Sequence, residues 1–164
     1  MAQGTEPKWQ GKATAELKGT TGEQIWPFLE EFCNLDKFFP GVDKCYRIEG
    51  SPGQPGLVRH CEDGAGGWCN EKLLAIDPTN LCLSYQVVEN TVGLKNYVAT
   101  LKVLPVFEDG KPAAAAGCKI ELSFVSAPVQ GFKLEGFVSY VDGCVQFMAK
   151  KLEDAAAIKL KAQL

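Results

Sequence analysis

The chain has 164 residues, of which 46% are hydrophobic and 23% charged, and its net charge at pH 7 is -3. This length suits one domain with a sizeable core and is too short for two, so we expect residues 1–164 to form a single domain. The 17 basic side chains are spread along the chain, which argues against a nucleic-acid-binding protein.

The sequence predicts neither a leader peptide nor a membrane span. It begins Met-Ala-Gln-Gly-Thr-Glu-Pro-Lys, without an apolar segment, and no stretch approaches the roughly 20 apolar residues that a span needs. The seven cysteines are odd in number and never form a Cys-x-x-Cys pair, which is typical of a reducing compartment. With one histidine, His60, a metal site is not expected. We therefore expect a cytoplasmic protein without metal or cofactor.

The first elements are a strand and two short helices. Residues 8–17 alternate between apolar and polar side chains, which predicts a strand with one solvated face. Residues 20–24 offer a capping box in either of two registers, Thr20 with Glu23 or Thr21 with Gln24, ahead of apolar residues at helical spacing. A second short helix is expected over 34–39, ending before Pro40-Gly41.

Strands then follow in close succession and a long helix ends the chain. Apolar positions three and four apart predict one amphipathic helix over residues 132–163. The order of elements indicates an α+β fold, in which a seven-stranded curved antiparallel sheet is covered by this helix. The six further strands are expected over 42–49, 56–62, 68–77, 81–89, 93–107 and 117–125, with a loop over 108–116.

Two ionisable residues are predicted to lie on the inner face of neighbouring strands. Side chains alternate along a strand, so Arg59 should lie on one face with Leu57 and Cys61, and His60 on the other. Burying an isolated charge costs several kcal/mol, so such groups are kept inside only if they are paired, hydrated or bound to a ligand. The same alternation groups Cys69, Glu71, Leu73 and Ala75.

Several inner residues are small, and a curved sheet around one helix leaves a hollow unless its inner side chains are large. We therefore expect a cavity into which Arg59 and Glu71 both project. The alternative is a buried ion pair that only fixes the register of the two strands. The small residues are Cys61, Cys69, Ala75 and Ala99.

Five short segments, spread from Lys8 to the middle of the chain, carry a family resemblance. They are Lys8-Trp9-Gln10-Gly11-Lys12, Glu23-Gln24-Ile25-Trp26, Gly56-Leu57-Val58-Arg59, Asn70-Glu71-Lys72-Leu73 and Asn96-Tyr97-Val98-Ala99-Thr100. With the order of elements, they resemble the plant helix-grip superfamily, which includes START-like lipid carriers, birch-pollen allergens and polyketide cyclases. Within it, the chain is most similar to lachrymatory-factor synthase.

The resemblance implies the helix-grip fold and a set of site residues. An arginine and a glutamate are regarded as the essential pair of the synthase, and they correspond to Arg59 and Glu71. Tyr85 and Tyr97 correspond to pocket-lining positions, and Leu122 replaces a lining aromatic. Cys69 is expected to face the cavity by strand alternation.

Abscisic-acid receptors share the superfamily, but the sequences of their gate and latch are missing at residues 63–67 and 92–95. Phe39 takes the position of their ligand-anchoring lysine. We therefore do not expect hormone signalling of that kind.

Three classes of function stay open. The first is binding of a small hydrophobic ligand with one polar end, with cofactor-independent isomerisation or cyclisation by Glu71 as general acid or base and Arg59 as oxyanion stabiliser. The second is a non-catalytic carrier or sensor of a lipid or hormone-like ligand. The third is a protein-interaction module that uses its loops. The sequence gives no firm sign of an oligomer.

Overall fold

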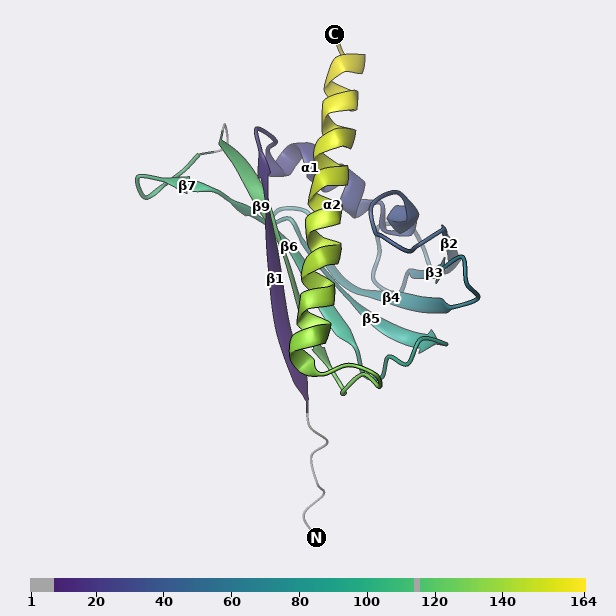
Figure 1. The fold of residues 1–164 in the computed structure, drawn as a ribbon. Coiled ribbons are helices and arrows are strands. Elements are labelled where there is room, and N and C mark those ends of the chain that lie inside the picture. Colours follow the sequence, from purple (N-terminus) through teal and green to yellow (C-terminus); the bar gives the residue numbers. More distant parts are fainter. Residues whose placement is uncertain (1–7, 114–115) are drawn as a thin grey trace.

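The computed structural model describes residues 8–113 and 116–164. Seven strands form one antiparallel sheet in the order β1-β9-β6-β5-β4-β3-β2, and two short strands form a separate hairpin. The long helix α2 crosses one face of the curved sheet (Figure 1). The α+β helix-grip prediction is therefore confirmed. The elements are β1 (Trp9–Lys18), α1 (Gly22–Glu30), the 3₁₀ helix η1 (Phe32–Lys37), β2 (Lys44–Glu49), β3 (Val58–Glu62), β4 (Trp68–Asp77), β5 (Cys82–Asn90), β6 (Val98–Pro105), β7 (Phe107–Glu108), β8 (Lys111–Pro112), β9 (Gly117–Ser126) and α2 (Leu134–Ala162).

Helix α1 begins at a reciprocal cap that uses the second of the two predicted registers. The Gln24 backbone N–H donates to the Thr21 hydroxyl, and the Thr21 backbone N–H donates to the Gln24 side chain. Two otherwise unpaired backbone donors are thus satisfied. The cap directs Ile25, Trp26 and Leu29 into the core.

The core lies between the sheet and α2. Gly11 of β1 is needed there, because a Cβ atom at this position would lie 2.6 Å from the Phe124 ring and 2.8 Å from Val138. The absence of a side chain therefore allows β1, β9 and α2 to approach one another closely. Alternate residues of β1 and β9 fill the space below, among them Ala13, Ala15, Leu17, Ile120 and Leu122.

Three local predictions were wrong. Ala75 was expected on the inner face, but a register irregularity between Leu73 and Ala75 turns it outward. Ile76 packs against the core instead. The cause is a β-bulge, which inserts one residue and reverses the alternation beyond it.

The other two errors concern strand ends. The strand expected from Gly93 begins at Val98, because the Asn90 side chain accepts from the Val92 and Leu94 backbone N–H groups and closes a loop. The loop expected over 108–116 contains the β7–β8 hairpin, whose Asp109 and Gly110 both have positive φ. This backbone conformation suits a two-residue hairpin turn. Residues 114–115 of that loop lie outside the described residues. So do residues 1–7, in which no leader peptide was expected.

Candidate functional site

Arg59 and Glu71 are directly opposite each other on β3 and β4 and form a buried ion pair. The Arg59 Nε donates to Glu71 Oε1 at 2.8 Å, and the residues are only 5% and 8% exposed. Arg59 Nη1 also donates to the Phe32 carbonyl oxygen at 2.8 Å. The pair therefore ties η1 to the sheet as well as linking two strands.

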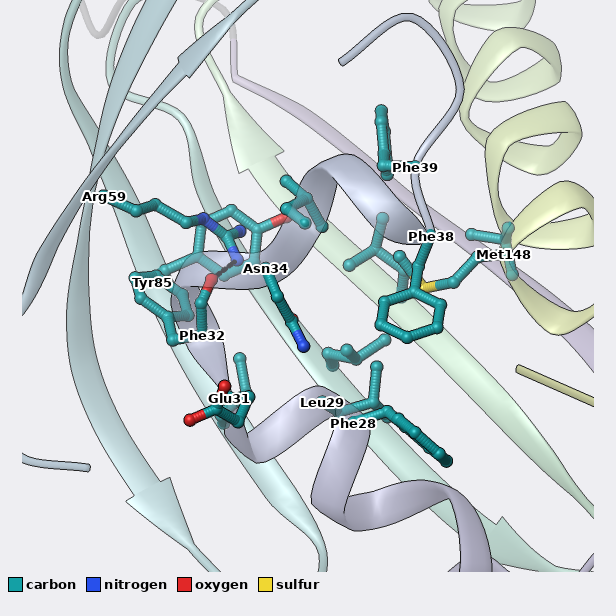
Figure 2. A pocket seen from close by; sticks show the side chains of 15 residues that line it. Phe28, Leu29, Glu31, Phe32, Asn34, Phe38, Phe39, Arg59, Tyr85 and Met148 are labelled. Carbon is teal, nitrogen blue, oxygen red and sulfur yellow. Dashed lines mark hydrogen bonds between the residues drawn. The ribbon is translucent and has the colours of Figure 1, made fainter. Parts of the chain in front are cut away.

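The guanidinium of Arg59 is surrounded by aromatic rings. Its central carbon lies 3.8 Å from the centroid of the Phe32 ring and 4.8 Å from that of Tyr85 (Figure 2). Burial acts to lower the pKa of Arg59, but the Glu71 charge and smaller contributions outweigh it and leave that pKa raised. Arg59 is therefore a fixed cation with part of its hydrogen-bonding capacity already used.

The concave side of the sheet holds a cavity of about 370 Å³, at the small end of the range for ligand pockets. Exposed residues Val92, Phe132 and Tyr140 mark its mouth. Among the described residues that line it, Glu71 is the only charged one. The lining is Leu35, Phe39, Val42, Cys61, Cys69, Glu71, Tyr85, Val92, Leu94, Tyr97, Leu122, Val129, Phe132, Phe137, Tyr140 and Val141.

All the predicted ligand-binding residues lie in this wall, which includes Tyr85, Tyr97, Leu122, Cys69 and Phe39. Their roles stay a prediction, because geometry does not test them. Arg59 differs, because it lines a smaller pocket of about 30 Å³ beneath η1 (Figure 2), roughly the room of one or two water molecules. The predicted pair is thus brought together, with Glu71 facing the main cavity and Arg59 the small pocket.

The two tyrosine hydroxyls reach the cavity without a protein partner. Among the side-chain atoms of the described residues that are sealed from solvent, only the Trp26 indole nitrogen lacks a hydrogen bond. No hydrogen bond joins the Tyr85 or Tyr97 hydroxyl to another described residue, and neither hydroxyl is among the sealed atoms. Tyr97 lines the main cavity, and Tyr85 lines both this cavity and the small pocket. Burial raises the pKa of both tyrosines, which keeps their hydroxyls protonated and able to donate.

Two cysteines also line the wall. Cys61 and Cys69 are opposite each other on β3 and β4, and Cys61 donates through its thiol to Cys45 Sγ at 3.6 Å. This contact lowers the pKa of Cys45 to about 7. Burial and the nearby Glu71 charge raise the pKa of Cys69, so its thiol stays neutral.

Sequence reasoning missed the side of the cavity formed by α2 and two loops. Phe137 and Val141 belong to the predicted apolar face of the helix, and their i, i+4 spacing was a usable signal. Val92 and Val129 lie in loops, whose positions depend on tertiary contacts and carry no such periodic signal.

The described residues contain no group of three or more His, Cys, Asp or Glu side chains placed to hold a metal ion. Within that same part of the chain, no helix is long and apolar enough to cross a membrane.

Comparison with known proteins agrees with this architecture. Residues 8–157 match the family described as polyketide cyclase/dehydrase and lipid transport. The chain belongs to this family, and membership suggests binding of a hydrophobic ligand.

Two solved bacterial structures share the fold. The protein XoxI from Bacillus cereus matches with a TM-score of 0.72 and 21% identity, over 91% of this chain and 96% of that one. An uncharacterised protein from Bacillus thuringiensis matches with a TM-score of 0.69 and 20% identity, over 90% and 98% respectively. At these identities the likeness concerns the fold alone.

Proposed function

We propose that this protein binds a small hydrophobic molecule with one polar end in the main cavity. The observation that carries this proposal is the composition of the wall, in which apolar side chains surround Glu71, Tyr85 and Tyr97. Apolar walls remove the body of a ligand from water, and a few fixed polar groups orient it. Family membership supports the same function.

The proposals on domain, origin, location and kinship rest on the sequence alone. We propose one domain over residues 1–164, in a plant protein of the cytoplasm that is related to lachrymatory-factor synthase. The segments around Arg59 and Glu71 support the kinship, and the scattered cysteines support a reducing compartment.

A catalytic version of the function is a cofactor-independent isomerisation or cyclisation. Glu71 would accept a proton from one atom of the ligand and return it to another. Arg59, expected from the sequence to stabilise an oxyanion, would instead act as a positioning residue, because it does not line the main cavity and its Nε holds one carboxylate oxygen of Glu71 at 2.8 Å. The alternative is a carrier or sensor, which would use the same cavity without turnover.

The binding function is tested by filling the cavity. Protein isolated gently from cells is extracted, and the released small molecules are identified by mass spectrometry. Leu122→Trp, in the cavity wall, is expected to lose the bound molecule, whereas Val125→Trp, on the exposed face of the same strand, keeps it. Equal retention by both variants would contradict the proposal.

Catalysis and transport are separated at Glu71. In an enzyme, Glu71→Gln keeps affinity for product-like ligands but loses turnover by about 10²-fold or more, since a positioned acid or base contributes about 10²–10⁴-fold. In a carrier, no sulfenic-acid or polyketide-like substrate is converted, and the variant changes affinity alone. Rates of conversion and dissociation constants of both proteins decide between the two.

A further inference from the structure

The charge balance of the main cavity restricts the chemistry of its ligand, if the proposed binding function holds. Sixteen side chains of the described residues line the cavity, and Glu71 is the only one of these with a full charge. Within the described part of the chain, no lysine, arginine or histidine belongs to this wall. An anionic ligand group would therefore enter a site without a cation of its own.

The cation bound to Glu71, Arg59, is already neutralised. Its Nε binds Glu71 at 2.8 Å and its Nη1 binds the Phe32 carbonyl oxygen at 2.8 Å. Arg59 lines the pocket of about 30 Å³ beneath η1 and not the main cavity, although the two adjoin and share part of their walls. Figure 2 shows the guanidinium directed toward Phe32 and Tyr85. The pair Arg59–Glu71 thus contributes no net charge to attract an ion of either sign.

The wall does offer an unused hydrogen-bond acceptor. Glu71 Oε1 receives Arg59, with the Cys61 thiol 3.9 Å away, while no described residue donates to Glu71 Oε2. Because Oε2 is not among the sealed atoms without a partner, it is accessible from the cavity. A carboxylate oxygen accepts hydrogen bonds only, so its partner must be a donor.

The tyrosine hydroxyls complete this arrangement. Tyr85 and Tyr97 both line the cavity and have no hydrogen-bond partner among the described residues, so their hydroxyls can donate to a ligand oxygen. A ligand hydroxyl would donate to Glu71 Oε2 and accept from a tyrosine, so that all the polar atoms are paired. A carboxylate would face Oε2 with no proton between two anionic oxygens, and burial of an unpaired charge costs several kcal/mol.

We propose that the main cavity selects a neutral ligand whose polar end is a hydroxyl group, and that it rejects carboxylates and ammonium ions of the same hydrocarbon chain. The ligand hydroxyl donates a hydrogen bond to Glu71 Oε2, which an ether cannot do, so the alcohol is preferred over the ether. The neutral Arg59–Glu71 pair provides the discrimination against ions.

The test compares four ligands with one chain length: octan-1-ol, octanoate, octylammonium and 1-methoxyoctane. Their affinities are measured at pH 7.5 by displacement of N-phenyl-1-naphthylamine, a neutral fluorophore. Octan-1-ol is expected to bind at least tenfold more tightly than either ion and about fivefold more tightly than the ether. Octanoate or octylammonium binding as tightly as the alcohol would overturn the inference.

Two variants test whether Glu71 and Tyr97 cause the preference for the alcohol. Glu71→Gln introduces an amide donor, so the preference for octan-1-ol over octanoate is expected to shrink by about tenfold. Tyr97→Phe, which keeps the ring but removes a donor that either ligand oxygen can use, is expected to weaken the alcohol and the ether alike, by about threefold. Tyr46→Phe, on the exposed outer face, is the matched control and changes neither. If Glu71→Gln leaves the preference intact and Tyr97→Phe leaves the affinity for octan-1-ol unchanged, the inference is wrong.

Failure of the underlying function gives a different result. If neither the fluorophore nor any octyl compound binds, the proposed cavity function is wrong and the inference falls with it. If the fluorophore binds and all four compounds displace it equally, the cavity function stands and the hydroxyl preference alone is refuted.

Discussion

The two halves of α2 cover very different parts of the sheet. Beneath the C-terminal half, Leu152 and Ala156 are 0% and 2% exposed and belong to the continuous hydrophobic core. Beneath the N-terminal half, Phe137 and Val141 belong to the same core but also line a cavity of about 370 Å³.

The helix has an apolar face along both halves, so the difference arises from the residues opposite. α2 contacts α1, β1 and β9, which supply large side chains such as Ile25, Leu17 and Ile120. At the cavity the strands β3 and β4 contribute Cys61 and Cys69, whose side chains are too small to fill the curve of the sheet. A hollow therefore forms where small residues meet strong curvature.

The largest effect is expected from a comparison of two leucine-to-alanine substitutions, one in the packed core and one in the cavity wall. Leu152→Ala creates a new void in packed core and should lower the free energy of unfolding by about 4 kcal/mol. Leu122→Ala removes the same atoms next to existing space that solvent can enter, and should cost about 2 kcal/mol. Urea unfolding of both variants measures the difference. Equal costs would show that the two regions are packed alike.

A somewhat smaller effect is expected from the ion pair at the cavity wall. Arg59→Met leaves the Glu71 carboxylate and the Phe32 carbonyl oxygen without their donor and should destabilise the fold by about 3 kcal/mol. The exposed Arg47 is the matched control, and Arg47→Met should change stability by less than about 0.5 kcal/mol.

The double variant Arg59→Met with Glu71→Leu sharpens this test. It removes both charges and should recover much of the lost stability, because a buried pair is costly mainly when it is broken. A double variant less stable than Arg59→Met would mean that Glu71 stabilises the fold without its partner.

The sequence predicted the facing of Arg59 and Glu71 because alternation along regular strands is a local property. It failed at Ala75, where a bulge changes the alternation and no residue pattern signals it. The sequence also could not predict that Arg59 lines the small pocket and not the main cavity. This placement depends on η1, whose Phe32 accepts a hydrogen bond from Arg59 across 27 positions of sequence.

The smallest effect concerns the reactivity of two thiols, Cys45 beside the cavity-lining Cys61 and Cys118 in the packed core. The hydrogen bond from Cys61 lowers the pKa of Cys45 to about 7, whereas burial and the nearby Glu153 charge raise the pKa of Cys118 to about 11. The thiolate is the nucleophile, so alkylation of Cys45 by iodoacetamide should rise with pH through about 7 and level off above it. Cys118 should react at least about tenfold more slowly at pH 7.

Cys61→Ala tests the cause of this reactivity. Without the thiol donor, the midpoint for Cys45 should move up toward the ordinary value of about 8.5, and its alkylation at pH 7 should slow. Peptide mass spectrometry after timed labelling follows both cysteines in the same sample, with Cys118 as the internal reference. A midpoint that stays near 7 in Cys61→Ala would mean that the positive charge of Arg59, which also lowers this pKa, is sufficient by itself.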